Sequence, residues 1–240
     1  MDSLKLNCEI VVKRTKESAV LNSGISGVKG LILDMDGVIV DSEPLHLLAF
    51  QELFSKHDID YTAEHNREFL GRKDIIIAEI LIERFKLPYT PKTFVENKEQ
   101  ILKRLIVHQS TARPGLFKIL DLAKSIGLPI AVASSATMPT IQLVVDTLNI
   151  RSYFDSLTSG DEVEHGKPAP DVFLLAAKRL GLQPTQCLVV EDTLNGIKAA
   201  KAAGMHCIAI PCEATMHQDH SLADLRLTSL EEVDLVTLCA

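Results

Sequence analysis

The sequence VKGLILDMDG, at residues 28–37, is the clearest indication of the fold. It is a short apolar run bounded by glycine, which predicts a buried strand that leads into a loop. Similar runs rich in β-forming residues occur at residues 129–135, 187–193 and 205–211, and each follows a stretch with helical spacing of apolar residues. This alternation predicts right-handed crossovers between parallel strands. We therefore expect a Rossmann-like α/β core, in which helices flank a parallel sheet.

The helices of this core are predicted from apolar residues spaced three or four positions apart, in the segments 116–123, 141–148 and 172–180. A shorter, alanine-rich helix is expected at residues 195–203. Gly204 should close its last turn, because glycine readily adopts a positive φ there.

The segment between about residues 43 and 113 lacks strand patterns and has helical apolar stripes instead. The stripes are formed by Ile76, Ile80 and Leu81, and by Phe94, Ile101, Leu102 and Leu105. We expect residues 43–113 to form an inserted α-helical cap domain, residues 28–42 and 114–240 to form the catalytic core, and residues 1–27 to be an N-terminal extension. Because the insert follows the first strand, it should lie over the carboxyl end of the sheet, where open α/β sheets bind ligands.

The composition is that of a globular protein, with 240 residues of which 46% are apolar and 24% are charged. The net charge of −7 argues against nucleic acid as a partner. No apolar run approaches the roughly 18 to 20 residues of a membrane span, so we expect no membrane partner. Five cysteines without paired metal spacing, and no secretory signal pattern, favour reduced thiols and a cytoplasmic location. The sequence gives no indication of the oligomeric state.

Asp34 and Asp36 are the sharpest local feature of the sequence, because they stand two positions apart at the end of an apolar run. Strand periodicity places both carboxylates on one side, where they repel each other. Such a pair is usually held by a cation or by a difference in protonation state. A strand that ends in an Asp-Gly turn explains the isolated motif equally well.

Polar residues also follow other predicted strands or precede a helix: Ser134 and Ser135, Lys167, and Glu191 with Asp192. The carboxyl ends of parallel strands meet at one edge, so these side chains are expected to converge there. Taken singly, the lysine is more simply a solvated loop residue and the serine a helix cap.

Four ordered motifs, LILDMDGV, AVASS, HGKPAPDVF and VVEDTLNGIKAAKAAG, together resemble the haloacid dehalogenase superfamily of phosphotransferases, in the branch with a helical cap. The resemblance covers nearly all of residues 28–230. It implies that Asp34 is the nucleophile and carries an aspartyl-phosphate. It also implies that Asp36 is the acid and base, which protonates the leaving oxygen and then activates water.

The same resemblance assigns the remaining residues of the core motifs. Ser134 corresponds to the hydroxyl that binds phosphate, and Ser135 beside it is assigned to substrate binding. Lys167 corresponds to the lysine that neutralises the nucleophile and the phosphoryl oxygens.

A magnesium site is also implied by the resemblance. Its ligands would be the Asp34 side chain, the Asp36 backbone carbonyl, and Asp192 with help from Glu191. An all-oxygen set of this kind suits Mg²⁺.

The cap contributes four further candidate residues for substrate binding. His46 lies where relatives place a hinge or gating residue, and a histidine on the helix surface is an equal alternative. Arg72 and Lys73 lie in the loop that contacts substrate in relatives, or form a solvated basic turn. Lys98 lies on an apolar stripe, where its charge must reach solvent along the helix or meet an anion.

These features lead to a magnesium-dependent phosphatase that acts on a small phosphorylated metabolite, either a sugar phosphate or a nucleotide-derived phosphate. Asp36 favours phosphate chemistry over halide displacement in this superfamily. The alternative is a β-phosphoglucomutase-like sugar phosphate mutase, whose cap-loop arginine stands a few positions after a glycine, whereas here Arg72 follows Gly71 directly. A member that binds a ligand without turnover is a third reading.

Overall fold

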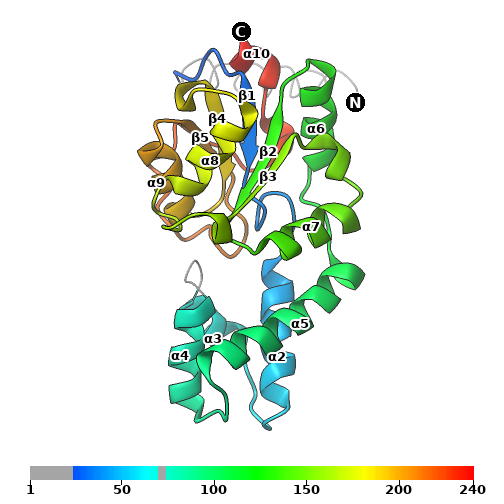
Figure 1. Ribbon diagram of the computed structural model, residues 1–240, viewed down its shortest axis with the longest axis vertical. Coiled ribbons are helices and arrows are strands. Elements are labelled where there is room, and N and C mark those ends of the chain that lie inside the picture. The colour runs from blue at the N-terminus through cyan, green and yellow to red at the C-terminus, as the bar shows by residue number, and fades with distance from the viewer. Residues whose placement is uncertain (1–23, 70–73) are drawn as a thin grey trace, which may run out of the picture.

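The computed structural model describes residues 24–69 and 74–240. In this part of the chain six strands form one sheet, in the order β3-β2-β1-β4-β5-β6, and every neighbouring pair is parallel (Figure 1). The strands are β1 (Gly30–Leu33), β2 (Ile130–Ser134), β3 (Ser156–Ser159), β4 (Cys187–Glu191), β5 (His206–Ala209) and β6 (Leu225–Arg226). The prediction of a parallel sheet flanked by helices is confirmed.

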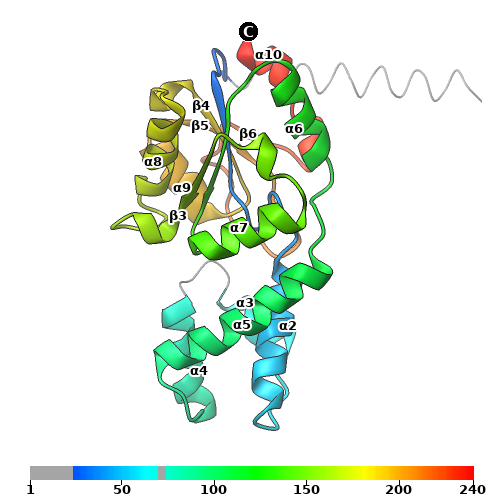
Figure 2. The ribbon, with the colours of Figure 1, turned by 45° about the vertical axis from the view of Figure 1, so that its right-hand side comes forward.

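Helices cover both faces of the sheet, α6, α7 and α10 on one and α8 and α9 on the other (Figures 1 and 2). The core helices are α6 (Leu116–Ser125), α7 (Met138–Thr147), α8 (Asp171–Leu180), α9 (Leu194–Ala202) and α10 (Leu235–Cys239), and single 3-10 turns lie at Arg151–Tyr153, Gly160–Glu162, Pro184–Gln186 and Leu230–Glu232. Successive side chains of a strand point to opposite faces. Accordingly Leu31 and Leu33 pack in the cluster with α6 and α7, whereas Ile32 packs in the cluster with α8 and α9.

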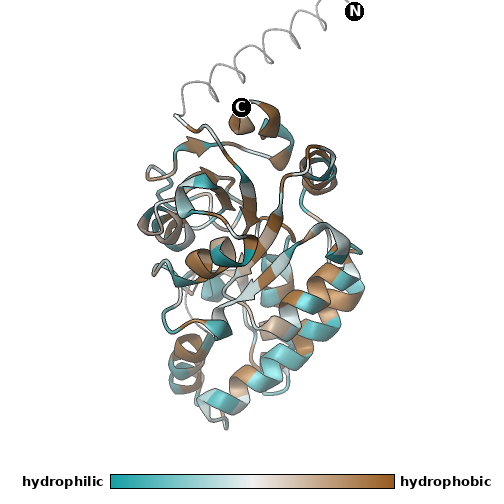
Figure 3. Ribbon diagram, turned by 45° about the horizontal axis from the view of Figure 1, so that its top comes forward, coloured by the Kyte–Doolittle hydropathy of each residue, from teal (hydrophilic) through white to brown (hydrophobic). Residues whose placement is uncertain are grey.

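The inner strands of the sheet are mostly hydrophobic, whereas the helices around it mix hydrophobic and hydrophilic residues (Figure 3). All residues of β1, β2 and β4 are buried, as expected for the inner strands of a sheet covered on both faces. Gly204 follows α9 with a φ of 75°, as the sequence predicts. Among the described helices, none has the length and low charge that crossing a bilayer requires.

Four helices follow β1 and lie together beyond the carboxyl end of the sheet (Figures 1 and 2). They are α2 (Glu43–Ser55), α3 (Ala63–Arg67), α4 (Asp74–Phe85) and α5 (Pro91–Gln109). Their shared core is aromatic, because Phe54 stacks on Tyr61 with ring centroids 4.6 Å apart and meets Phe85 and Phe94 edge-on. These aromatic side chains pack the four helices together and belong to the same buried cluster as Leu31 and Leu33 of β1.

The apolar stripe predicted on α4 is wrong by one position at its start. Ile76 is 43% exposed, whereas Ile77, Ala78 and Leu81 are buried. The run of three consecutive isoleucines does not reveal which of them faces inward, and packing against α5 selects Ile77.

The segments that enter and leave the four helices run side by side. The Asp41 N–H donates to the Thr111 carbonyl at 3.1 Å, and the Arg113 N–H donates to the Ile39 carbonyl at 2.9 Å. These two hydrogen bonds hold the segment that enters the four helices beside the segment that leaves them, next to the end of β1.

Of the N-terminal extension predicted at residues 1–27, only residues 24–27 lie within the described part. Ile25 is 6% exposed and packs in the core, and the Val28 N–H donates to the Leu238 carbonyl at 3.1 Å. The chain therefore passes beside the C-terminal helix before it enters β1.

Candidate active site

Asp34 and Lys167 form an ion pair at the carboxyl end of the sheet. The Asp34 N–H donates to the Val190 carbonyl at 3.0 Å, which places its side chain where β1 and β4 end. Lys167 Nζ donates to Asp34 Oδ1 at 2.5 Å and to Glu191 Oε1 at 2.6 Å. These three side chains are at most 8% exposed. The sheet therefore joins three sequence-distant candidate residues in one buried cluster.

The Lys167 ammonium is held on other sides by neutral groups. It donates to the Ala133 carbonyl at the end of β2, 3.3 Å away, and lies 4.7 Å from the centre of the Phe173 ring. Burial by itself would lower the pKa of Lys167, but the ion pairs with Asp34 and Glu191 raise it above its ordinary value. The lysine is thus a fixed positive charge beside Asp34.

Glu191 organises the loop that follows β4. Its Oε2 accepts hydrogen bonds from the Asp192 and Thr193 N–H groups, both at 2.9 Å, and from the Thr193 hydroxyl at 3.0 Å. Thr193 in turn caps α9 by accepting from the Gly196 N–H at 3.1 Å. A Cβ at Gly196 would overlap with Glu191 Oε1, so only glycine fits there. Both oxygens of Glu191 are thus taken by donors of the protein.

Asp192 is 2% exposed, and its two carboxylate oxygens have different surroundings. Oδ2 accepts from the Thr215 hydroxyl at 3.1 Å and from the Cys212 thiol at 3.3 Å. Burial raises the pKa of Cys212, so the sulfur keeps the proton that it donates. Oδ1 is buried and has no hydrogen-bond partner among the described residues. A buried carboxylate oxygen without a donor is unusual and points to a cation.

The charges of this cluster suit a divalent cation. One oxygen each of Asp34, Glu191 and Asp192 can be chosen so that all three lie within 4.8 Å of one another. Burial raises the pKa of Asp34 to about 8; Lys167 opposes this rise, and the charge of Glu191 adds to it. Burial, together with Glu191 and Asp34, likewise raises the pKa of Asp192 well above its ordinary value. Among the described residues, three carboxylates face one ammonium here, and a hard dication bound by oxygens would balance the excess charge.

Asp36 lies between the sheet and the four helices, with its side chain 39% exposed. His46 Nε2 is 3.9 Å from Asp36 Oδ1. Burial raises the pKa of Asp36, but nearby His46, the Ser42 hydroxyl and the charge of Lys98 together outweigh it, so that the pKa lies below its ordinary value. Ser42 stands at the N-cap of α2 but makes no side-chain cap there, contrary to the capping role that its position suggests. Asp36 is therefore ionised while these contacts hold.

Lys98 is 1% exposed, so it neither reaches solvent nor presents its charge outward. Its ammonium donates to Asp74 Oδ2 at 2.7 Å and to His46 Nδ1 at 2.9 Å, and lies 5.2 Å from the centre of the Phe50 ring. Because an ammonium only donates, His46 Nδ1 must accept and the proton of a neutral ring is on Nε2, which faces Asp36. Burial raises the pKa of Asp74, but Lys98 and His46 lower it more. Lys98 and His46 thus form one chain of contacts that ends at Asp36.

Ser134 and Ser135 are placed differently. Ser134 ends β2, is 1% exposed, and its hydroxyl accepts from the Ala136 N–H at 3.0 Å. Ser135 is exposed, at the start of the loop that leads to α7. Ser134 therefore belongs to the same edge of the sheet as Asp34, and Ser135 to its rim. Arg72 and Lys73 lie outside the described residues.

Sequence patterns did not single out several polar residues that the fold brings to the site. Cys212 and Thr215 contact Asp192. Glu99 on α5 accepts from the Thr140 hydroxyl of α7 at 2.5 Å, which links the helical segment to the core. None of them belongs to a local motif, because their roles depend on chain-distant partners.

A family model described as haloacid dehalogenase-like hydrolase matches residues 28–204, the segment that holds every core residue of this site. The chain belongs to the haloacid dehalogenase-like hydrolases. The curated fructose-1-phosphate phosphatase YqaB of Escherichia coli is 35% identical over 183 residues, which is 75% of this chain and 95% of that protein. The match and this relative confirm the prediction of a phosphohydrolase of the haloacid dehalogenase type.

Solved structures of haloacid dehalogenase-like proteins share the fold. CbbY from Rhodobacter sphaeroides, crystallised with phosphate, is 29% identical with a TM-score of 0.79, and the alignment covers 89% of this chain and all of that one. A putative β-phosphoglucomutase from Thermotoga maritima is 26% identical with a TM-score of 0.74, covering 87% of this chain and 98% of that one. Hydrolases of this family generally depend on Mg²⁺, and the buried Asp34, Glu191 and Asp192 are present here.

Proposed function

We propose that this protein is a magnesium-dependent phosphatase that hydrolyses a small phosphorylated carbohydrate through an aspartyl-phosphate on Asp34. The observation that carries the proposal is the Lys167 ammonium 2.5 Å from Asp34, inside a buried group of three carboxylates. The similarity to a fructose-1-phosphate phosphatase supports a sugar phosphate as substrate.

In the first step a carboxylate oxygen of Asp34 attacks phosphorus, and the bond from phosphorus to the sugar oxygen breaks. Asp36 gives its proton to that oxygen, which leaves as the alcohol. In the second step water attacks phosphorus, Asp36 takes the proton, and the bond between Asp34 and phosphorus breaks to release inorganic phosphate. Each step moves one proton through Asp36, so the carboxyl returns to its starting state.

The lowered pKa of Asp36 suits its role as the base of the second step. The first step needs the protonated form, and a phosphoryl dianion beside Asp36 would raise its pKa by repulsion between like charges. Asp36 would therefore take up its proton as the substrate binds. The Nε2–H of His46 faces the same carboxylate and orients it.

Lys167 neutralises Asp34 and a transferring phosphoryl group, which otherwise repel each other. Ser134, at the adjacent strand end, is positioned to donate its hydroxyl to a phosphoryl oxygen, since its observed contact uses it only as an acceptor. The exposed Ser135 would meet substrate at the rim.

A Mg²⁺ ion would be held by the side chains of Asp34 and Asp192 and by the Asp36 carbonyl, with Glu191 behind them. When bound, it would offset the negative charge on Asp34 and on the phosphoryl oxygens. Asp192 offers a buried oxygen with no donor among the described residues, which fits this role. Glu191 contributes charge and fixes the loop, because donors of the protein occupy both of its oxygens.

The helical segment 43–113 would act as the cap that closes over the site. It contacts the core through His46 beside Asp36 and through Glu99 beside Thr140. Arg72 and Lys73 would contact the sugar part of the substrate, whereas Lys98 would act through His46 and Asp74. The four cysteines in the described part are free thiols, which fits a reducing compartment such as the cytoplasm.

A panel of hexose, pentose and hexitol phosphates, assayed for inorganic phosphate with and without Mg²⁺, tests this function. We expect turnover of at least one sugar phosphate that needs Mg²⁺ and is lost in Asp34→Asn. Formation of an isomeric sugar phosphate without phosphate release would identify a mutase instead. No turnover of any ester by the wild-type protein would indicate a binding protein.

A further inference from the structure

The segment between β5 and β6 contacts Asp192 through several side chains. Its Thr215 hydroxyl and Cys212 thiol both contact Asp192 Oδ2, at 3.1 Å and 3.3 Å. Thr215 is 5% exposed and Cys212 is 4% exposed, so water does not compete for these contacts. Two side chains from one short segment thus act on one carboxylate oxygen.

The hydroxyl of Thr215 is oriented by its own neighbours. It accepts from the Cys212 N–H at 3.0 Å, which uses one of its lone pairs. Its single proton has three acceptors in reach: the Asp192 carboxylate at 3.1 Å, and the carbonyl and sulfur of Cys212, both at 3.4 Å. The Asp192 oxygen is the closest of these acceptors, so it receives the proton.

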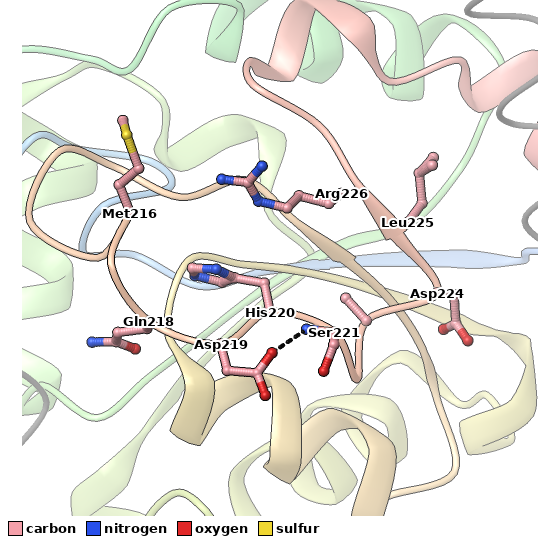
Figure 4. A pocket seen from close by; sticks show the side chains of 9 residues that line it. Met216, Gln218, Asp219, His220, Ser221, Asp224, Leu225 and Arg226 are labelled. Carbon is pink, nitrogen blue, oxygen red and sulfur yellow. Dashed lines mark hydrogen bonds between the residues drawn. The ribbon is translucent and has the colours of Figure 1, made fainter.

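The same segment holds the backbone next to Asp192. His220 Nε2 lies 2.9 Å from the Asp192 carbonyl, and because that oxygen only accepts, the ring donates. Gln218 Oε1 accepts from the Leu194 N–H at 2.7 Å. Figure 4 shows Gln218 and His220 projecting from the same stretch of chain. The segment between β5 and β6 therefore holds both the Asp192 side chain and the backbone of the loop after β4.

These contacts leave the two oxygens of Asp192 unequal. Oδ2 has two donors, and it lies so close to Gly37 that a Cβ there would overlap with it. Oδ1 is buried and has no donor among the described residues, and the Asp192 carboxylate belongs to the buried group that contains Asp34 and Glu191. The arrangement keeps one oxygen available to a cation.

We propose that Thr215, supported by Cys212, is a positioning residue for the divalent cation, because it holds Asp192 Oδ2 and thereby directs Oδ1 to the metal. The inference rests on the proposed function, since it concerns the metal of that same site. Hydrogen bonds from outside a metal site to its ligands commonly set affinity by about 10- to 100-fold. A merely structural role of Thr215 would change stability without changing metal affinity.

Titration calorimetry of the metal-free, full-length protein with MgCl₂ separates these roles. Thr215→Val removes the hydroxyl at nearly constant shape and should raise the Kd for Mg²⁺ about tenfold or more. Thr215→Ser retains the donor and should restore the Kd to within about threefold of wild type. The control Thr237→Val removes a similar hydroxyl, which donates to Asp234 at 2.7 Å in α10, and should leave the Kd unchanged.

An unchanged Kd in Thr215→Val, or an equal loss in the serine variant, would overturn the inference and leave the phosphatase proposal intact. Absence of Mg²⁺ binding in the wild-type protein would instead refute the metal site of the proposed function. If Thr215→Val does not fold, as judged by circular dichroism, Cys212→Ala provides the same test through the second donor. It should raise the Kd at least about threefold, and an unchanged value would contradict the inference.

Discussion

The Lys167 ammonium lies 2.5 Å from Oδ1 of Asp34, although 133 positions separate the two residues in the chain. The same ammonium contacts Glu191 at 2.6 Å, so one cation is shared by two buried carboxylates. In the proposed mechanism Lys167 offsets negative charge on Asp34, and this contact depends on the loop that precedes α8.

Replacing Lys167 with Met tests this balance at similar side-chain volume. We expect kcat to fall by about 10²- to 10³-fold, as is typical when a preorganised charge is removed from a transition state. Steady-state kinetics measure the change, with the exposed Lys178→Met in α8 as the control. Equal activity in the two variants would contradict the assigned role of Lys167.

The raised pKa of Asp34 predicts that Mg²⁺ stabilises the protein more at high pH. Without metal, the folded carboxyl has a pKa of about 8 against an ordinary value of 3.8, so the folded state holds a proton that the unfolded chain has lost between these values. The contribution of this group to stability therefore falls as the pH rises through that window.

Because the cation competes with the proton, the gain in Tm on adding Mg²⁺ should increase from about pH 5.5 to about pH 8 by at least about 3 °C. Differential scanning calorimetry measures it, with KCl of equal ionic strength as the control. The same gain at both pH values would show that Mg²⁺ does not bind through Asp34.

Gly196→Ala should damage the site although it lies in a helix. Gly to Ala within a helix usually stabilises by about 1 kcal/mol. Here the new Cβ would displace Glu191 from Lys167 and from the N–H groups of Asp192 and Thr193, so we expect a net loss of about 1 to 3 kcal/mol. Activity should fall at least about tenfold as the loop moves.

Urea unfolding and phosphate-release assays of Gly196→Ala give both quantities. The control is Lys198→Ala, which places an alanine on the exposed side of the same helix. A variant as stable and active as this control would show that Glu191 has room to move.

Glu99→Ala should weaken closure of the helical segment over the site. Glu99 on α5 accepts from Thr140 at 2.5 Å at the start of α7, the helix that follows Ser134 and Ser135. Loss of about 1.4 kcal/mol of closure energy would raise KM about tenfold. The control Glu96→Ala lies on the same helix with its side chain 55% exposed and should keep the wild-type KM. An equal KM in the two variants would show that Glu99 does not contribute to closure of the helical segment.

The sequence predicts the inner strands of the sheet well because each is a compact apolar run. Strand β3 has the sequence SLTS and β6 has two residues, so neither has a pattern that distinguishes it from a loop. Both are recognised only through pairing, β3 with β2 and β6 with β5. Outer strands of this kind form because a neighbouring strand pairs with them, and the local sequence does not reveal that pairing.

The residues of the site likewise fall into those that the sequence predicts and those that only the fold reveals. Asp34, Lys167 and Asp192 lie in motifs whose positions at strand and helix ends bring them together. Thr215 and Glu99 contribute through single contacts with distant residues, and nothing in their local sequence marks them. Lys98 is an intermediate case: its charge on an apolar stripe predicts that it either reaches solvent or meets an anion, and the sequence does not show that Asp74 supplies that anion.

The most direct test of the central claim is to trap the phosphorylated residue. A reaction with a turned-over sugar phosphate and Mg²⁺ is quenched during the first turnover and treated with borohydride, which reduces an aspartyl-phosphate to homoserine. Peptide mass spectrometry should find homoserine at position 34, with none in Asp34→Asn. Homoserine at another aspartate, or none at position 34 while phosphate is released, would contradict the account.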